Sequence, residues 1–403
     1  MVKSEEHQGY EIKSKFLLNP FLWFSLVWVF VLILHSFNFS RVYPKTSESM
    51  YGFIITIVVI SIILAVLFHL FFLKKLKNIS INEKPLWIPI IIAYVILIFE
   101  TIYSKQLPLI SALTHSITYK DFGVPIVSGF MYSFSIFLSL MCSVKLIYGK
   151  KYKWLNFLAL LLSYGRFVLV YSRGGLVMCV LATIIIFFSR QKFSWWTIPA
   201  LLVLAVIGLY LFNILGNIRM GFAWNDSSYL LKISEFDKKY YALKDFSWGI
   251  VYIDSPFGNL LYNEAQVKPL DDSTGLFAMM LTSVITERLY PAYDHAVKLA
   301  IPNLTTATMF SASYKYMGYT GMIAVYIEMV AIVFISCLLC KKSQYALIAC
   351  SSMLTILCSL SFFDNMFYTS GNSFALIYLV LFTIFFYKRT NTNSSQNLEM
   401  ERA

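Results

Sequence analysis

Residues 154–189 read WLNFLALLLSYGRFVLVYSRGGLVMCVLATIIIFFS, and this stretch decides the fold. Two apolar segments, 154–171 and 174–189, are separated only by a short polar turn that contains Arg173. Each segment is predicted to cross the hydrocarbon core of a bilayer, about 30 Å thick, as a helix. Two such helices joined by a tight turn are typical of an all-α polytopic membrane protein.

The rest of the chain repeats this pattern. Of its 403 residues, 58% are hydrophobic and 13% are charged, whereas about a quarter of the residues of a soluble domain are charged. Ten transmembrane helices are predicted, at residues 17–36, 51–73, 86–104, 125–147, 154–171, 174–189, 195–215, 318–340, 344–362 and 367–387. Residues 1–403 are therefore predicted to form a single transmembrane domain.

The formal net charge of +12 lies on one side of this topology. If the amino terminus is cytoplasmic, the segments on the cytoplasmic side carry 18 of the 33 basic residues and six of the 21 acidic ones, and the remainder of the chain is neutral. An excess of Lys and Arg on one side is the positive-inside signal that orients helices in a membrane. We therefore expect both termini in the cytoplasm and no nucleic-acid partner.

One connection is much longer than the others. Residues 216–317, between the seventh and eighth spans, form a predicted extracytoplasmic loop that carries nine basic and ten acidic residues. This balanced composition favours a folded segment over a disordered one. Within the loop, the stretch from Gly275 to Thr286 is apolar but too short to span, so it is predicted to be one interfacial or re-entrant helix.

Three charged residues in or beside the predicted spans are expensive to place in a membrane. Arg166 and Arg173 are seven residues apart, a spacing that returns to nearly the same helix face, so both guanidinium groups are expected to face one spot. Planar guanidinium groups bind phosphate oxygens in a bidentate way, which predicts a site for a lipid-linked phosphate or diphosphate. The alternative is that Arg173 anchors the turn to lipid headgroups while Arg166 snorkels. Glu328, in the eighth span, is expected to pair with Arg166, to be protonated, or to couple protons.

The chain lacks the motifs of several enzyme classes. It has no Walker loop, no dinucleotide fingerprint, no HExxH and no GxSxG elbow, so neither ATP nor a nicotinamide cofactor is expected. The five histidines have no metal-ligand spacing, and Cys337 and Cys340 sit in an apolar helix without accompanying histidines. No cofactor and no metal ion are therefore predicted.

Several segments resemble a known family, the bacterial oligosaccharide repeat-unit polymerases, also called Wzy-type O-antigen and capsule polymerases. The segments from Tyr119 to Pro125, from Ser172 to Gly174 and from Tyr252 to Leu260 are similar to the Y-x-D-F-G-I-P, S-R-G and Y-x-x-x-P-x-x-N-L motifs of that family. The stretch from Asn303 to Gly321 is similar to the segment that closes the family's large loop, but it lacks the usual aspartate before Gly318.

The resemblance implies a membrane glycosyltransferase of the C-type architecture in the bacterial plasma (inner) membrane. Its substrate would be a polyprenyl-diphosphate-linked oligosaccharide, with membrane lipids and a chain-length regulator as further partners. Arg173 and Arg288 would stabilise the diphosphate leaving group. The residues that would bind substrate are Arg166, Arg219, Tyr252, Asn259 and Asn303. The acceptor hydroxyl needs a base, for which the candidates are Glu287, His295, Asp294 and Asp254.

Three other functions fit the same sequence features. An O-antigen ligase would move the same donor onto a lipid-core sugar, and would use the same arginine chemistry. A flippase or other transporter would use Glu328 and Arg166 to couple ions to alternating access, but such proteins more often contain repeated halves. A structural membrane scaffold is the remaining alternative.

Overall fold

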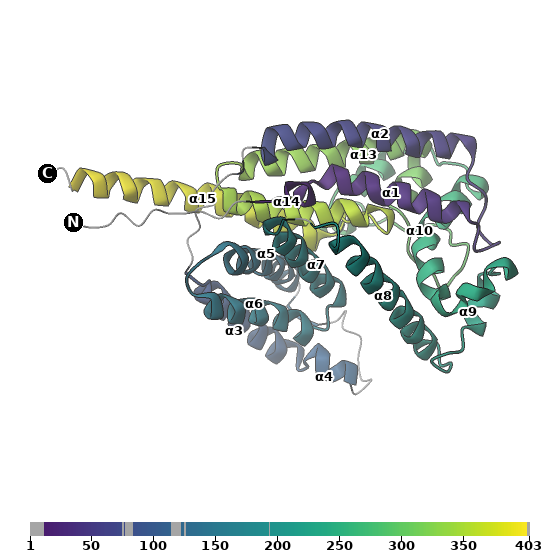
Figure 1. Cartoon of the computed structure of the whole chain (residues 1–403), viewed down its shortest axis with the longest axis horizontal. Helices are drawn as coiled ribbons and strands as arrows, with labels where there is room; N and C mark the ends of the chain where they lie inside the picture. The colour runs from purple at the N-terminus through teal and green to yellow at the C-terminus, as the bar shows by residue number, and fades with distance from the viewer. Residues whose placement is uncertain are drawn as a thin grey trace.

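The computed structural model describes residues 12–74, 76, 84–113, 122–124, 126–192 and 194–400. Side chains are described for all of these except residues 112, 113, 198, 200, 201 and 386–400. The helices are η1 (Lys15–Leu18), α1 (Pro20–Ser36), α2 (Glu48–Phe68), η2 (His69–Leu73), α3 (Trp87–Ser104), α4 (Pro108–Leu113), α5 (Val127–Tyr148), α6 (Lys153–Leu169), α7 (Arg173–Arg190), α8 (Thr197–Arg219), α9 (Ser228–Ile233), η4 (Lys238–Phe246), α10 (Ser247–Gln266), α11 (Ser273–Met280), α12 (Ser283–Leu289), α13 (Ser311–Cys340), α14 (Gln344–Ser359), η5 (Leu360–Phe362) and α15 (Ser370–Met400). The described residues form no sheet, which confirms the predicted all-α fold (Figure 1).

Seven helical stretches are long and apolar enough to cross a membrane. They are Glu48–Leu73, Trp87–Ser104, Val127–Tyr148, Arg173–Arg190, Leu202–Arg219, Ser311–Cys340 and Gln344–Phe362. The other three predicted spans fall on α1 and α6, which have 17 residues each, and on the apolar first half of α15. The structure therefore shows a multi-pass membrane protein with seven candidate spans.

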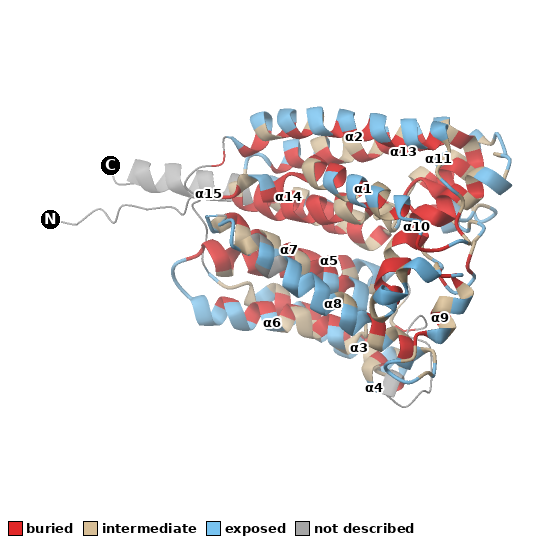
Figure 2. Cartoon of the chain, turned by 45° about the vertical axis from the view of Figure 1, so that its right-hand side comes forward, coloured by how far each residue is buried: buried red, intermediate tan, exposed pale blue. Residues whose placement is uncertain are grey.

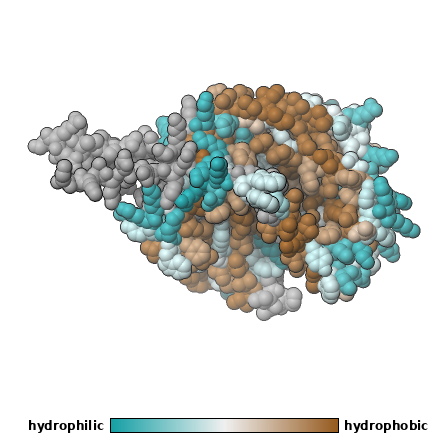
Figure 3. All heavy atoms as spheres, viewed as in Figure 1, coloured by the Kyte–Doolittle hydropathy of each residue, from teal (hydrophilic) through white to brown (hydrophobic). Residues whose placement is uncertain are grey.

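Two helices form the centre of the bundle. In α5 and α14, 78% and 83% of the residues in an apolar stretch of 18 residues are buried. In the other candidate spans at most 39% of the residues of such a stretch are buried. The remaining helices surround these two and expose Ile, Leu and Phe side chains, as the alternation of red and blue in Figure 2 shows. An exposed apolar surface of this extent suits lipid contact, and Figure 3 shows it as a brown region between polar ends.

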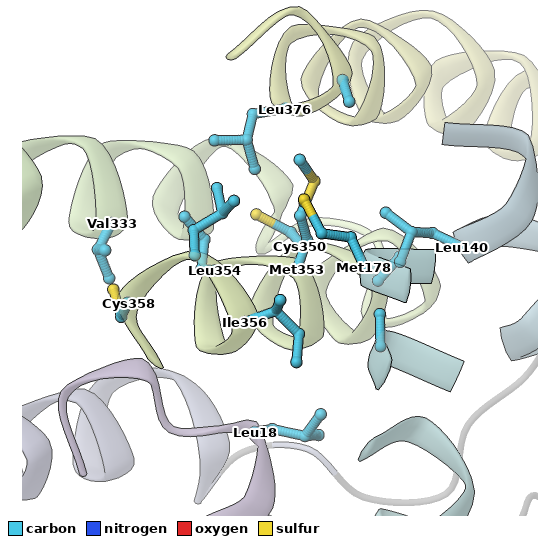
Figure 4. Close-up of a cluster of buried hydrophobic side chains, with 14 of the residues drawn as sticks. Leu18, Leu140, Met178, Val333, Cys350, Met353, Leu354, Ile356, Cys358 and Leu376 are labelled. Carbon is cyan, nitrogen blue, oxygen red and sulfur yellow. The ribbon is translucent and has the colours of Figure 1, made fainter. Parts of the chain in front are cut away.

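The core joins elements that are far apart in the sequence. Figure 4 shows Leu140 of α5 and Met178 of α7 close to Cys350 and Met353 of α14. Helix α1, the first long helix, also packs on α14. Its Trp28 is fully buried, and the indole Nε1 donates a hydrogen bond of 3.1 Å to the Ser361 hydroxyl just beyond α14.

Basic side chains gather at one end of the bundle, which we call the basic end. The ammonium group of Lys145 donates to the carbonyl of Lys84, and the guanidinium of Arg190 donates to the carbonyl of Ile147. The Ser14 hydroxyl donates to the Gln191 carbonyl over 2.7 Å, so the start of the described chain lies at this end as well. These contacts bring together four segments that the positive-inside pattern places on one side of the membrane.

The opposite end, which we call the loop end, carries the long connection between α8 and α13. This connection runs over residues 220–310 and contains α9, η4, α10, α11 and α12, of which α9 and α10 are labelled in Figure 1. The prediction of a single helix from Gly275 to Thr286 is wrong, because the structure has two helices there. Extended backbone at Leu281 and Thr282 ends α11 and begins α12, and the Thr286 hydroxyl bonds the Ala278 carbonyl, which folds the two helices together.

Candidate functional site

The connection between α14 and α15, residues 360–370, is where several parts of the loop end meet. The Ser361 carbonyl accepts a hydrogen bond from the Met309 amide over 2.9 Å. The Phe363 ring lies 5.0 Å from the Tyr252 ring of α10. The Tyr368 ring lies 3.5 Å from the His295 ring, measured between centroids. A short segment without a long helix of its own therefore holds three parts of the loop end together.

Helix α12 is fixed to the first residue of α15. The Ser283 amide donates to the Tyr368 carbonyl over 2.8 Å, and the hydroxyl groups of Ser283 and Ser370 are 2.8 Å apart. The Val284 amide donates to the Ser370 hydroxyl over 2.9 Å. Arg288 lies on the last turn of α12, is exposed, and makes no hydrogen bond or ion pair within the described residues. The position of its helix is thus set by three contacts while its own guanidinium group stays available.

The first turns of α7 and α15 lie on either side of Tyr132 from α5. A Cβ atom built on Gly371 would be 2.4 Å from the Tyr132 ring, and one built on Gly175 would be 2.9 Å from it. Real Cβ atoms do not approach a ring so closely, so a larger residue at either position would displace the Tyr132 ring, and at Gly175 the Phe167 ring as well. The N-termini of two long helices are thereby brought together at the loop end.

Arg173 is the first residue of α7, at this meeting of helix N-termini. Its guanidinium donates to the hydroxyl of Tyr171 and lies 4.6 Å from the centre of the Tyr171 ring. Tyr171 itself adopts a left-handed backbone conformation with φ of 57°, which turns the chain from α6 into α7. Ser172, the N-cap residue, does not cap the helix with its side chain. The first-turn amides of α7 therefore remain oriented toward the loop end.

These features place positive groups in the region. Each helix N-terminus carries a partial positive charge, which favours anions. At α15 the amides of Ser370 and Asn372 already donate, to the Ser283 hydroxyl and to the Thr369 carbonyl. Arg173 adds a full charge at one N-terminus, and Arg288 adds another on the helix that is bonded to Ser370. An anion with several oxygens, such as a phosphate or diphosphate, is the ligand class that this arrangement favours.

Arg166 does not belong to this region, and two predictions about it are wrong. Its side chain is buried, and its guanidinium donates to the Met131 carbonyl and the Ser135 hydroxyl, each over 2.9 Å. It forms an ion pair of 3.1 Å with Glu100 of α3, not with Glu328. The seven-residue spacing predicts a common face only within one helix. Because α6 ends at Leu169, Arg166 and Arg173 belong to two helices.

Two further candidates lie beside the connection 360–370 without touching Arg173. The Tyr252 ring is packed between Phe212 of α8 and Phe363, at centroid distances of 5.2 and 5.0 Å. Arg219, the last residue of α8, is exposed and close enough for its charge to act on the Tyr252 hydroxyl. This pair forms a second, smaller group of polar side chains at the loop end.

Two asparagines proposed as substrate ligands have structural contacts. The Asn259 amide is fully buried, donates to the carbonyls of Leu304 and Thr306, and accepts from the Ala300 amide. These bonds attach the segment before α13 to α10. They use both N–H groups and the oxygen of the Asn259 side chain. Asn303 is exposed, and its amide donates to the Tyr229 hydroxyl.

The four candidate bases separate into two groups. Asp254 is 1% exposed, and its carboxylate is 2.8 Å from Nδ1 of His35, so it is closed off from solvent. The other three gather near Tyr368. The Asp294 carboxylate accepts a hydrogen bond of 2.7 Å from Lys315. Glu287 is exposed on α12, and the charges of Glu287 and Asp294 both act on the Tyr368 hydroxyl.

His295 is held as a neutral ring. Its Nε2 atom is buried and has no hydrogen-bond partner within the described residues. Burial lowers the pKa of His295 from 6.5 to about 4, and the nearby Asp294 carboxylate only partly opposes this. At neutral pH the ring is therefore uncharged, so it accepts a hydrogen bond more readily than it takes a full proton.

Acid is expected to destabilise the fold through His295. Because its folded pKa of about 4 lies below the ordinary 6.5, the unfolded chain binds the proton first as the pH falls. This contribution to stability is complete above about pH 6.5 and is lost as the pH falls toward 4.

The variant His295→Phe retains a ring against Tyr368 but cannot bind a proton. Its unfolding temperature relative to wild type should therefore rise as the pH is lowered from 7 to about 4.5. A difference that stays constant over this range would contradict the prediction.

Several residues of the region were not predicted from the sequence. Tyr132, Tyr171 and Tyr368 were passed over because tyrosines are common in this chain and nothing in their spacing marks them. Glu100 had a usable signal, since it is an isolated acid within an apolar span and such an acid requires a partner. Of the motif from Tyr119 to Pro125, residues 119–121 and 125 lie outside the described part of the chain.

The described residues contain no group of three or more His, Cys, Asp or Glu side chains that could hold a metal ion. No protein-family model, no curated protein and no solved structure matches this chain.

Proposed function

We propose that the protein is a membrane glycosyltransferase that polymerises polyprenyl-diphosphate-linked oligosaccharide repeat units into O-antigen or capsular polysaccharide. The observation that carries the proposal is the meeting of the α7 and α15 N-termini across Tyr132, with Arg173 at one of them. A diphosphate needs positive charge from several directions, which this arrangement favours. The exposed apolar side chains of the surrounding helices suit a polyprenyl chain.

The proposed reaction transfers the growing glycan from its carrier to a new repeat unit. A hydroxyl oxygen of the acceptor sugar attacks the anomeric carbon of the donor. The bond between that carbon and the diphosphate oxygen breaks, and its electron pair stays on the diphosphate. Arg173 and Arg288 stabilise this charge. The hydroxyl proton passes to Glu287, directly or through water, while His295 accepts a hydrogen bond from the acceptor.

We further propose that α1, α6 and α15 join the seven candidate spans to make ten, with both termini in the cytoplasm of a bacterium and the loop end outside the plasma membrane. The clustering of Lys84, Lys145 and Arg190 at the basic end supports this orientation. The lipid-linked substrate, membrane lipids and a chain-length regulator would then meet the protein on the outer side.

The orientation predicts that Ser273→Cys is labelled in intact cells. Ser273 begins α11, is exposed, and lies at the loop end. A membrane-impermeant maleimide should therefore react with the variant without permeabilisation, while the six native cysteines, which are all buried, give a low background. Labelling that requires access from the cytoplasm would contradict the proposed orientation.

The function is tested by giving the purified protein, reconstituted in liposomes, lipid-linked repeat units as its substrate. A ladder of products on the lipid carrier supports a polymerase. Transfer to an added lipid-core acceptor, without a ladder, identifies an O-antigen ligase. Movement of unmodified substrate across the bilayer identifies a flippase. Either of the last two results would overturn the proposal.

A further inference from the structure

Glu328 is placed near the middle of a membrane-spanning helix. It lies twelve residues before α13 ends at Cys340, which corresponds to about 18 Å along the helix axis. Lys341 and Lys342 follow directly, and Lys residues of this kind mark the edge of a membrane. Within the described residues Glu328 makes no hydrogen bond and no ion pair, and no neighbouring charge acts on it.

Glu328 lies between an exposed side and a buried side of α13. Ile327 and Ile335 are 60% and 57% exposed, whereas Val325, Met329 and Val333 on the other side of α13 are buried in the core. In Figure 1, α13 lies beside α2 along one edge of the molecule. The side chain of Glu328 is therefore at the border of a surface that would contact lipid.

An unpartnered carboxyl group at this depth is costly. Polar groups within the hydrocarbon region require a hydrogen-bond partner, and charged groups require a counterion or a proton. The part of the chain that the structure describes supplies Glu328 with neither a hydrogen-bond partner nor a counterion. The alanines at positions 324 and 331 lie one turn before and one turn after Glu328, and small residues so placed let another helix approach closely. The surface thus combines a carboxyl group that has no hydrogen-bond partner with small side chains that allow another helix to pack closely.

A second copy of the same chain supplies the complementary group. In an isologous dimer each residue near the twofold axis faces its own counterpart. Two carboxyl groups that hold at least one proton between them satisfy each other, because a protonated carboxyl donates and a carboxylate accepts. A lipid tail offers neither a donor nor an acceptor.

We propose that the face of α13 that carries Glu328 is the docking surface for a second copy of this protein. The two copies pack α13 against α13, and the two Glu328 carboxyl groups share hydrogen bonds within the membrane. This inference does not depend on the proposed glycosyltransferase activity.

The test compares dimerisation of the full-length protein in lipid bilayers with that of Glu328→Gln and Glu328→Leu. Fluorescence energy transfer between labelled copies is measured over a series of protein-to-lipid ratios. The glutamine variant retains a group that both donates and accepts, so it should dimerise like wild type. The leucine variant should dimerise about 3-fold to 30-fold more weakly, the range that corresponds to typical hydrogen bonds between membrane helices. Leucine suits a lipid-facing position, so this variant should still fold.

The position of the interface is tested by cross-linking. Ala331→Cys, one turn from Glu328, should form a disulfide between copies under mild oxidation. Ile207→Cys on α8 is 49% exposed at a similar depth of another span and should not. The native cysteines are buried and provide the background. Wild-type protein that stays monomeric at every ratio, a leucine variant that dimerises as tightly as wild type, or cross-linking through position 207 would each overturn the proposal.

Discussion

Arg173→Lys is expected to lower the rate of glycan polymerisation by about 10²-fold to 10³-fold, nearly as much as Arg173→Ala. Lysine retains the positive charge but loses the planar group that binds two oxygens at once and stacks on an aromatic ring. The Arg173 guanidinium lies over the Tyr171 ring and donates to its hydroxyl, and the proposed site uses it to bind two diphosphate oxygens at once. The measurement is the initial rate of ladder formation in liposomes that contain equal amounts of folded protein.

Arg41→Lys is the matched control for this experiment. Arg41 also lies at the loop end and forms an exposed ion pair of 3.1 Å with Asp237. Exposed pairs contribute little to stability, so this variant should polymerise at the wild-type rate. If Arg173→Lys makes polymer of normal length and amount, Arg173 is only an anchor to lipid headgroups. The diphosphate site would then have to be centred on Arg219 and Arg288.

Arg166→Met is expected to reduce the free energy of unfolding by about 3–5 kcal/mol. The side chains of Arg166 and Glu100 are 5% and 0% exposed, and they form an ion pair. Removal of the arginine leaves a carboxylate buried without a counterion, which costs more than the pair contributes. The measurement is the fraction of protein that remains folded in detergent as temperature or denaturant is increased.

The double variant Arg166→Met with Glu100→Leu separates the ion pair from simple packing. Because it removes both charges, it should recover more than half of the lost stability, even though the carbonyl of Met131 and the hydroxyl of Ser135 lose a donor. A double variant that is as unstable as the single one would show that the bonds to Met131 and Ser135, and not the charge of Glu100, account for the loss.

The helices were predictable because a membrane restricts the choice of structure. In hydrocarbon every backbone polar group must be bonded within its own segment, so a continuous apolar run becomes a helix. All ten predicted spans fall on helices for this reason. The sequence also indicated that residues 216–317 fold, but a single apolar run there hid the break at Leu281 and Thr282, which depends on contacts between α11 and α12.

The arrangement of the candidate site was less predictable, because it depends on contacts between distant segments. The predicted roles of Arg173 and Arg288 rest on exposure and charge, and the structure leaves both side chains accessible. The packing of Tyr132 on Gly175 and Gly371 brings the N-termini of α7 and α15 close to each other beside Arg173. No periodicity in the sequence reports such a contact. The seven-residue spacing did not place Arg166 and Arg173 on one helix face, because α6 ends at Leu169, between these two residues.

The contact between α1 and α14 has a consequence for the timing of synthesis. Trp28 and its hydrogen-bond acceptor Ser361 are 333 residues apart. At a translation rate of about 5 to 20 residues per second, α1 enters the membrane roughly 20 to 70 seconds before α14 is made. During that interval the Trp28 indole lacks its acceptor, and the newly inserted helices have no α14 to pack around. Ribosome stalling before Gln344 would therefore leave a chain without its centre, open to the proteases that remove unassembled membrane proteins.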